Sequence, residues 1–404
     1  MSVATLQQSG SDQSVLSHDE VVARARRVAI AIKDNAAQAE ELRRVPDESI
    51  SLLKEQGLLR VIQPKRAGGW ELSMRAHLDV VTTLAEGCGS TSWVAGVAHA
   101  HSWMLGHFPE QVLQDVYADD PDTLVAAVIA PRGKAVRHAD GSHSLEGFWP
   151  FGSGCLHAEW LILGAEVSDE AGEVVDAGDF LVPASSVEIR DDWYVAGLQG
   201  TGSNSMTCGG LKVPAHRFLS LDRLFALDTP GLESYDGWLY RAEAVPVLSL
   251  CITGSALGIV RAALPEYLRV VPGKALAYTG YTADEFPGTQ INIASAATLI
   301  DCAEFLLYRI ADDIDRYAKA GDRMPMEMRG RIRMDCAQAV RFCMEAMDKM
   351  FHTAGASGLS LKSSLQRAWR NVHAINMHGL LAFDTSAELY GRVLLGLEPN
   401  TDII

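Results

Sequence analysis

The hydrophobic pattern of this 404-residue chain changes twice, near residue 119 and again near residue 236. Before the first change and after the second, apolar residues recur at helical spacing. Between them, over 123–217, short apolar runs alternate with clusters such as "PRG", "ADG" and "GTGSN", which favour turns. Short runs at this spacing indicate antiparallel strands rather than alternating strands and helices. The pattern therefore predicts a helical region, then a sheet, then a second helical region.

Several boundaries can be placed within this outline. Pro46 and Asp47 favour the start of a helix and Gly57 its end, and the apolar stretch after residue 77 should divide into two helices at Gly87–Gly89. The polar first sixteen residues, rich in Ser and Gln, are expected to be disordered. The predicted regions are 17–119 (helical), 120–218 (β), 219–240 (linker) and 241–404 (helical). Long helical segments are expected in the last region at 244–270, 290–320, 325–353 and 363–394.

Charge and cysteine content exclude several classes of protein. A net charge of −16 is unsuited to a nucleic-acid partner, which needs a basic surface. Seven scattered cysteines without a C-x-x-C pair are typical of reduced thiols. The first twenty residues lack the apolar run of a signal peptide, and the most apolar stretch, 244–260, is too short and too interrupted for a membrane span. We therefore expect a soluble, cytoplasmic protein without a membrane or nucleic-acid partner.

The stretch "FWPFGSGCLHAEW" (148–160) holds three candidate reactive groups, Ser153, Cys155 and His157. Ser153 lies in G-S-G, not in the G-x-S-x-G turn of a hydrolase. Cys155 and His157 are only two residues apart, whereas catalytic pairs usually come from separate segments. A hydroxyl between two glycines is better suited to hydrogen-bonding a flat ligand that approaches the backbone closely.

Two further patterns resemble known sites only superficially. His99, His101 and His107 would point in different directions from one helix, so we expect no metal site. The segment "GTGSNS" (200–205) lacks the lysine of a phosphate-binding loop and lies between predicted strands, so a turn is expected there. The tryptophans near the β region suit either the core or the wall of a site for a planar ligand.

The order of the three regions and several motifs resemble the acyl-CoA dehydrogenase family. The motifs are "VIAPRG" (128–133), "GFWPFGSGCLHAEWLIL" (147–163) and "DDWYVAGLQGTGSNSMTCGGLKVPAHRFL" (191–219). The resemblance covers almost the whole chain. It implies an α+β fold with an N-terminal helical domain, a central antiparallel β-barrel or sandwich domain and a C-terminal four-helix bundle.

Within that superfamily the chain is more similar to the two-component, reduced-flavin-dependent monooxygenases (group D), such as the oxygenase components of 4-hydroxyphenylacetate 3-hydroxylase and seco-steroid A-ring hydroxylase. The supporting motifs are "GSTSWV" (89–94), "SGCLHAEW" (153–160) and "LQRAWRNVHA" (365–374). Dehydrogenases need a carboxylate base, and the matching stretch here, "NMHGLLAFDT" (376–385), carries His378 instead. The alternatives are an acyl-CoA dehydrogenase, an N- or S-oxygenating relative, and a non-catalytic flavin-storage or scaffold protein.

The resemblance implies a specific chemistry. A separate, transiently bound NAD(P)H-dependent flavin reductase supplies reduced FAD or FMN. The flavin reacts with O2 to form a C4a-hydroperoxyflavin, which hydroxylates an aromatic substrate. Relatives assemble as homotetramers, as dimers of dimers, so the same assembly is expected here.

The resemblance also implies roles for individual residues. Ser153 matches the partner of flavin N5, His378 a histidine near the reacting oxygen, and His101 a histidine on the substrate side. These three are the expected catalytic residues. The expected cofactor-binding residues are Trp93, Ala130, Ser153, Trp193 and Ser203. The expected substrate-binding residues are His101, Ala127 and Leu380.

The chain departs from these relatives at the substrate side. Ala126, Ala127 and Val128 replace a run of serines, and Leu380 replaces a tyrosine of one relative. These changes make the expected pocket more apolar. A neutral or bulkier ring, whether indole-like, polycyclic or steroid-derived, then fits better than a small aryl acid.

Overall fold

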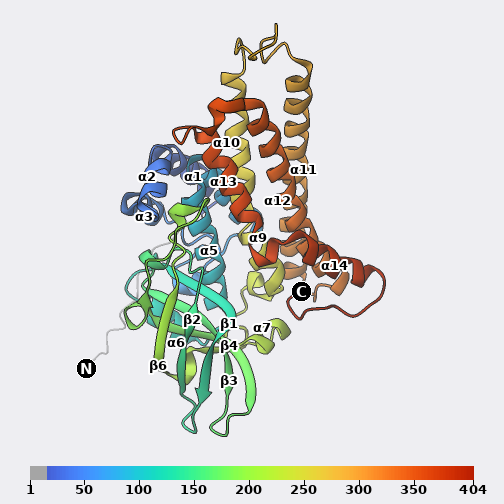
Figure 1. Cartoon of the computed structure of the whole chain (residues 1–404). Helices are drawn as coiled ribbons and strands as arrows, with labels where there is room; N and C mark the ends of the chain where they lie inside the picture. Colours follow the sequence, from blue (N-terminus) through green and yellow to red (C-terminus); the bar gives the residue numbers. More distant parts are fainter. Residues whose placement is uncertain (1–15) are drawn as a thin grey trace, which may run out of the picture.

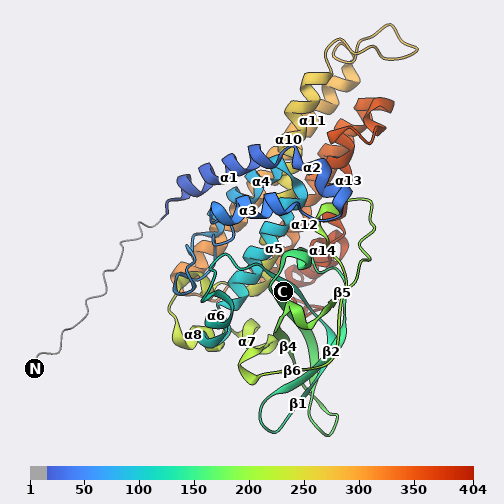
Figure 2. The ribbon, with the colours of Figure 1, turned by 90° about the vertical axis from the view of Figure 1, so that its left-hand side faces the viewer.

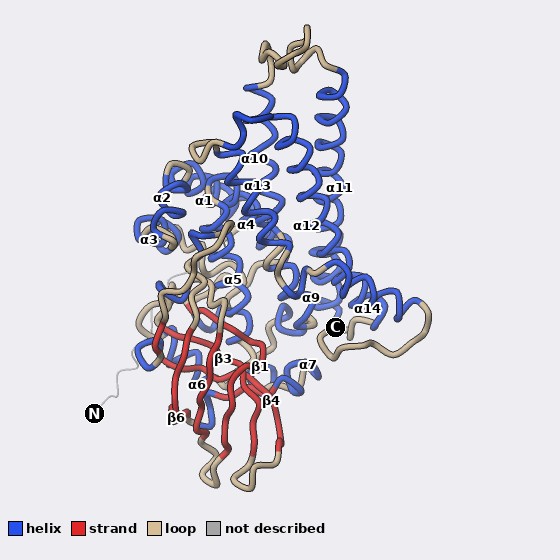
Figure 3. Tube along the Cα trace, viewed as in Figure 1, coloured by secondary structure: helices blue, strands red, loops and turns tan. Residues whose placement is uncertain are grey.

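A computed structural model describes residues 16–404 of the chain. The expected disorder at the N-terminus falls mainly on residues 1–15, which lie outside the described residues. Most of the helices occupy one end of the molecule and the sheet the other, with α6 and α7 beside the sheet, and α11 and α12 extend away from the sheet (Figures 1 and 3). The predicted α+β fold, with helices, then a sheet, then helices, is confirmed.

The N-terminal helices pack around two adjoining helices, α4 and α5. The elements are α1 (His18–Ile32), α2 (Asn35–Leu42), α3 (Asp47–Glu55), η1 (Lys65–Ala67), α4 (Met74–Gly87), α5 (Gly89–Leu105) and α6 (Glu110–Tyr117). The break predicted at Gly87–Gly89 is present, because Cys88 adopts an extended conformation between the two helices. α5 is buried along nearly its whole length, so its side chains contact all three regions of the chain.

The middle region forms one seven-stranded sheet in the order β5-β6-β2-β1-β3-β4-β7. Its elements are β1 (Val125–Arg137), β2 (His143–Trp149), η2 (Cys155–His157), β3 (Trp160–Ser168), β4 (Val174–Pro183), η3 (Ala184–Ser186), β5 (Glu188–Ile189), η4 (Gln199–Thr201), β6 (Met206–Val213), η5 (Ala215–Arg217) and β7 (Phe218–Ser220). The expectation of a purely antiparallel sheet is wrong in one place, because β1 and β3 pair in parallel.

The connection from β2 to β3 explains the parallel pair. β2 runs antiparallel to β1, and the chain then crosses through residues 150–159 to begin β3 beside the start of β1, with Trp160 opposite Val125. This crossing segment holds Ser153, at the end of the sheet that adjoins α5. Trp149, fully buried, donates from its indole Nε1 to Gly164 O at 2.7 Å. A Cβ on Gly133 would lie 2.3 Å from a Trp149 ring atom, so Gly133 allows this ring to pack.

The two faces of the sheet belong to different cores. On β3, Ile162 packs into a large cluster shared with the helices, whereas Leu161 and Leu163 pack into a smaller cluster with Trp149 on the opposite face. This alternation follows from the two-residue period of a strand. The sheet is therefore attached to the helical regions along one face.

The C-terminal region begins with short helices and continues as a bundle. Its elements are α7 (Leu221–Ala226), α8 (Pro230–Ser234), η6 (Trp238–Arg241), α9 (Ala244–Cys251), α10 (Gly254–Val270), α11 (Pro287–Ala320), α12 (Met326–Ala354), η7 (Gly355–Leu359), α13 (Ser364–Asn376), η8 (Gly379–Leu381) and α14 (Phe383–Leu394). Two segments expected to be continuous, 244–270 and 363–394, are each divided. The second break places His378 between α13 and η8, on an extended backbone.

Within residues 16–404, two helical stretches are long and apolar enough to cross a membrane by length and composition. In Ala244–Val270, which comprises α9 and α10, 83% of the most apolar window is buried inside the protein, as in the core of a soluble protein. In α11 only 22% of that window is buried.

α1 and α3 lie on the side of α4 and α5 seen in Figure 2, away from α11.

Candidate functional site

The segment that carries Ser153 is held rigidly against the loop before β6. The backbone N–H of Gly152 donates to Asn204 O at 3.1 Å, and that of Gly154 donates to Thr201 O at 3.0 Å. Gly154 has a φ of +76° and Phe151 one of +69°. A positive φ costs energy for a side chain such as that of Phe151, and strain of this kind is concentrated at functional sites.

The Ser153 hydroxyl belongs to a row of three hydroxyls, here called the hydroxyl chain: Ser153, Ser203 and Thr201. Trp93 of α5 donates from Nε1 to Ser153 Oγ at 3.0 Å. Ser153 Oγ lies 2.7 Å from Ser203 Oγ, which lies 2.6 Å from Thr201 Oγ1. Thr201 donates to Leu198 O at 2.8 Å. Through Trp93, the hydroxyl chain therefore joins α5 to the segment that carries Ser153 and to the loop before β6.

His378 approaches the same place from the C-terminal region. Its ring lies edge-on to Trp93, with the centroids 5.9 Å apart. His378 Nδ1 accepts from Leu380 N at 3.3 Å, so the neutral ring carries its proton on Nε2. Desolvation lowers the pKa of His378 to about 4 although the side chain remains accessible to solvent. His378 is therefore neutral at pH 7.

His101 lies eight residues beyond Trp93 on α5. Its Nδ1 donates to Val125 O at 2.7 Å, so Nε2 carries a lone pair in the neutral ring. The side chain is buried, and desolvation lowers its pKa to about 4. His101 can therefore act as a neutral hydrogen-bond acceptor beside the start of β1.

The other two histidines of this motif bond elsewhere. His99 Nδ1 lies 2.9 Å from the buried His77 Nδ1, and His107 Nδ1 lies 3.1 Å from Thr229 Oγ1. The three histidines thus contact three different neighbours, as the helical spacing predicted. Among residues 16–404, no cluster of three or more His, Cys, Asp or Glu side chains is arranged to hold a metal ion.

Phe151, in the segment that carries Ser153, and Trp193, in the loop before β6, form an aromatic contact. Their ring centroids are 6.1 Å apart and the rings are nearly perpendicular, at 86°. Trp193 Nε1 donates to Leu198 O at 3.2 Å, and Asn204 Oδ1 accepts from Trp193 N at 3.1 Å. Trp193 is half-buried and Phe151 exposed, so this pair lies at the rim of the region around Ser153.

The remaining predicted residues line β1 and η8. The register between β1 and β3 breaks between Val128 and Gly133, and Ala130 lies exposed in this irregular segment. Backbone groups released from a strand ladder are free to bind the polar edge of a ligand. Ala127 and Leu380 are both half-buried and pack against the helical core.

Cys155 and His157 have structural surroundings. Burial raises the pKa of Cys155 to about 12, so its thiol is not reactive at neutral pH. His157 Nδ1 lies 3.5 Å from Asp47 Oδ1 and 3.4 Å from Arg44 Nη2. Neither side chain bonds to the hydroxyl chain.

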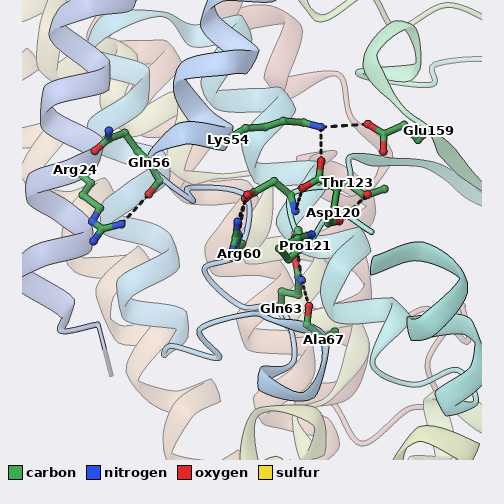
Figure 4. A network of polar contacts seen from close by, with 11 residues as sticks. Arg24, Lys54, Gln56, Arg60, Gln63, Ala67, Asp120, Pro121, Thr123 and Glu159 are labelled. Atoms are coloured by element: carbon green, nitrogen blue, oxygen red, sulfur yellow. Dashed lines mark hydrogen bonds and ion pairs between the residues drawn. The ribbon is translucent and has the colours of Figure 1, made fainter. Parts of the chain in front are cut away.

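A second polar group, here called the lysine network, holds α3 against the β region. Lys54 Nζ lies 3.2 Å from Asp120 Oδ2 and 3.2 Å from Glu159 Oε1 (Figure 4). Asp120 precedes β1, and Glu159 ends the segment that carries Ser153. The network therefore ties α3 to the chain just before β1 and to the C-terminal end of the segment that carries Ser153.

A hollow of about 290 Å3 lies next to η4. Gln199, Gly200 and Asn371 contribute to its lining, together with residues of α2, α4, α5, α10 and α13. Asn371 Oδ1 also accepts from Leu198 N at 2.8 Å. Ser153, Trp93 and His378 do not line this hollow, so volume alone does not identify the functional group.

The structure brings together residues from all three regions. Trp93, Ser153, Ser203 and His378 form a connected set, and Trp193 is joined to it through Leu198. These groups fit a flat heterocycle with polar edges: a hydroxyl at one edge, aromatic rings nearby and unpaired backbone in β1. The sequence reasoning missed Thr201, for which the only signal was a segment rich in hydroxyls.

Comparison with known proteins identifies the family of this chain. Residues 17–117 match the N-terminal domain family of acyl-CoA dehydrogenase, and residues 250–383 match a C-terminal domain family of the same enzymes. The flavin-dependent monooxygenase oxygenase subunit HsaA of Rhodococcus jostii is 34% identical, over 92% of this chain and 97% of its own length. The FADH2-dependent resorcinol hydroxylase oxygenase component of a Rhizobium species is 33% identical, over 95% and 96%.

Solved structures give the same result. The crystal structure of the 3-HSA hydroxylase from Rhodococcus superposes with a TM-score of 0.90 at 32% identity, covering 96% of this chain and 100% of that chain. XiaF from Streptomyces, in complex with FADH2 and glycerol, superposes with a TM-score of 0.88 at 30% identity, covering 95% and 97%. The chain therefore belongs to the acyl-CoA dehydrogenase family and, within it, to the flavin-dependent monooxygenases, as the oxygenase component of a two-component enzyme.

Proposed function

We propose that this oxygenase hydroxylates a neutral or bulky aromatic ring, using reduced flavin and O2. The observation that carries the proposal is the connected set of Ser153, Trp93 and His378, contributed by three regions of the chain. When bound, reduced flavin supplies the activation of O2 and the transfer of one oxygen atom to an electron-rich carbon. The protein must bind the ring, orient it and exclude water.

Ser153 would hold the polar edge of the flavin. Its hydroxyl is half-buried, and the segment that carries it is tied by backbone hydrogen bonds to the loop before β6. Ala130, in the irregular part of β1, would bind another edge through its backbone. Trp193 and Phe151 would close the rim against water.

His378 and His101 would act on oxygen and substrate. Both are neutral at pH 7, because desolvation lowers each pKa to about 4. His378 presents an Nε2–H donor and His101 an Nε2 lone pair. One histidine can therefore donate to an oxygen atom while the other accepts from a ring hydroxyl or N–H.

The substrate class follows from the apolar residues on this side. Ala127 and Leu380 offer no hydroxyl to a substrate, which favours an indole-like, polycyclic or steroid-derived ring over a small aryl acid. The names of relatives cover this range: resorcinol hydroxylase, indole-3-acetate monooxygenase of Acinetobacter baumannii and 3-HSA hydroxylase.

The name "oxygenase component", given to relatives, means that a separate reductase supplies the reduced flavin. For this chain we propose a transient NAD(P)H-dependent reductase, a cytoplasmic location and assembly as a homotetramer. The apolar face of α11 supports assembly, because Ile291 and Phe305 are 65% and 72% exposed. Light scattering of the purified protein measures the assembly directly.

The test of the reaction uses labelled oxygen. The protein is mixed with chemically reduced FMN or FAD and a panel of aromatic compounds, and 18O2 is then admitted. We expect one 18O atom in the hydroxylated product and less H2O2 when a good substrate is present. If every compound of the panel leaves all the O2 as H2O2, the proposed reaction is wrong.

A further inference from the structure

The hydrogen atoms of the hydroxyl chain can be assigned from its two ends. A hydroxyl has one hydrogen to donate and lone pairs with which to accept. At one end Leu198 O can only accept, so the Thr201 hydrogen is committed to it. At the other end the Trp93 N–H can only donate, so Ser153 accepts from it. The directions of the two inner hydrogen bonds follow from these ends.

Because Thr201 donates its only hydroxyl hydrogen to Leu198 O, its oxygen must accept the hydrogen bond from Ser203. Ser203 thus donates its own hydrogen to Thr201, so its oxygen must accept the hydrogen bond from Ser153. Every hydrogen of the chain therefore points away from Trp93 and toward Leu198. The Ser153 oxygen then has one unused lone pair, with which it can accept a hydrogen bond from a ligand.

Burial maintains this direction. Thr201 is 2% exposed and Ser203 4% exposed, so water does not compete for their hydroxyls. Leu198 O is held in place because Leu198 N donates to Asn371 Oδ1 and the peptide N–H of Thr201 donates to Leu198 O at 3.1 Å. Reversing the row would leave Thr201 Oγ1 and Leu198 O 2.8 Å apart with no hydrogen between them, at the cost of one buried hydrogen bond, roughly 1 kcal/mol.

The free lone pair distinguishes two forms of a flavin. N5 of oxidised flavin carries a lone pair, whereas N5 of reduced flavin carries a hydrogen and can donate. We propose that Thr201 and Ser203 are positioning residues that make Ser153 a hydrogen-bond acceptor, so that the site selects reduced over oxidised flavin. The inference rests on the proposed binding of flavin at Ser153.

The test measures binding rather than turnover. Dissociation constants for reduced and oxidised flavin are measured without oxygen, by quenching of tryptophan fluorescence, for the wild type, Thr201→Val and Thr201→Ser. Valine has the shape of threonine without the hydroxyl. In Thr201→Val, Ser203 loses its acceptor and turns its hydrogen to Ser153, which frees the Ser153 hydrogen for the ligand.

We expect the wild type to bind reduced flavin more tightly, and Thr201→Val to shift the ratio of the two dissociation constants about tenfold toward oxidised flavin, the worth of one hydrogen bond. Thr201→Ser retains the hydroxyl and should keep the wild-type ratio. Ser203→Ala should shift the ratio in the same direction, because it also frees the Ser153 hydrogen, and it replaces Thr201→Val if that variant does not fold.

The outcomes separate the two proposals. An unchanged ratio in Thr201→Val and Ser203→Ala, with wild type that prefers reduced flavin, overturns the role of the hydroxyl chain and leaves the proposed function standing. Equal affinity of the wild type for both flavin forms also overturns that role alone. A wild type that binds neither form overturns the proposed function and the inference together.

Discussion

The hydroxyl chain and the lysine network both hold the segment that carries Ser153, but they are built from different chemistry. Thr201 and Ser203 are neutral and almost wholly buried. Lys54 and its partner Glu159 are charged, and their side chains are 28% and 49% exposed. In the hydroxyl chain the acceptor at its far end, Leu198 O, determines where each hydrogen points, whereas in the lysine network water can replace any partner.

Because of this difference, the hydroxyl chain sets the direction of hydrogen bonds, whereas the lysine network only attaches one segment to another. A buried row of hydroxyls transmits the direction of its hydrogen bonds to its last member, because no solvent satisfies a group that turns the wrong way. A half-exposed ion pair only adds attraction between two segments, and exposed pairs contribute about 0–1 kcal/mol. We therefore expect changes in the hydroxyl chain to alter chemistry and changes in the lysine network to alter stability slightly.

The largest effect is expected for Ser153→Ala, which removes the member of the hydroxyl chain nearest the ligand. Loss of one preorganised hydrogen bond in an active site lowers rates by about 100-fold or more. We expect a fall of this order in product formed per flavin oxidised, with a matching rise in H2O2. Product is measured by chromatography and peroxide by a peroxidase assay, and an unchanged melting temperature shows that the fold is intact. Full coupling in this variant would remove Ser153 from the chemistry.

A loss of activity of comparable size is expected for His378→Ala, which leaves the hydroxyl chain complete. An acid or base of this kind contributes about 100-fold or more when it acts, but the flavin should still bind with the wild-type ratio of dissociation constants. In the wild type, protonation of His378 should abolish its contribution only as the pH falls toward about 4. A pH profile of product formation that already falls between pH 8 and 6 would contradict a neutral His378.

Acid should destabilise the buried neutral groups before it affects the lysine network. The pKa values of His99 and His101 are lowered by desolvation to about 4 in the folded protein, compared with about 6.5 unfolded. Their contribution to stability is therefore complete above pH 6.5 and is lost as the pH falls toward 4, about 3 kcal/mol each. Asp315, whose pKa burial raises to about 6, offsets part of this loss.

Thermal unfolding measured from pH 7.5 to 4.5 tests this sign. We expect the melting temperature to fall over that range, and Asp120 to remain charged throughout, because its pKa lies below its usual value. A melting temperature that rises on acidification would contradict neutral buried histidines.

The smallest effect is expected for Lys54→Met, which keeps the apolar stem and removes the charge. We expect a loss of less than about 1 kcal/mol and no change in coupling. The matched control is Lys349→Met, since the Lys349 side chain is also 28% exposed but lies 3.6 Å from a single carboxylate, Glu345, away from the site. Peroxide release from Lys54→Met above that of the control would show that the lysine network also orients Ser153.

Much of the fold could be predicted from the sequence because helix and strand periods are local properties. The order of the three regions, the break at Gly87–Gly89 and the end of a helix near Gly57 all depend on residues close together in the chain. The parallel pairing of β1 with β3 could not be predicted in this way, because it depends on how residues 150–159 cross the sheet. The division of 363–394 at His378 was missed although Gly379 follows it directly, because a single glycine within an apolar helical pattern is often tolerated.

For the site, the motifs in the sequence and their resemblance to a family were enough to select Ser153, Trp93 and His378 as candidates. Only the tertiary structure decided how they act on one another. Trp93 and Ser153 are 60 residues apart in sequence, and Ser153 and Ser203 are 50 apart. Hydrogen-bond direction depends on which partner each hydroxyl meets and on the exclusion of water, and both arise only when distant segments pack together.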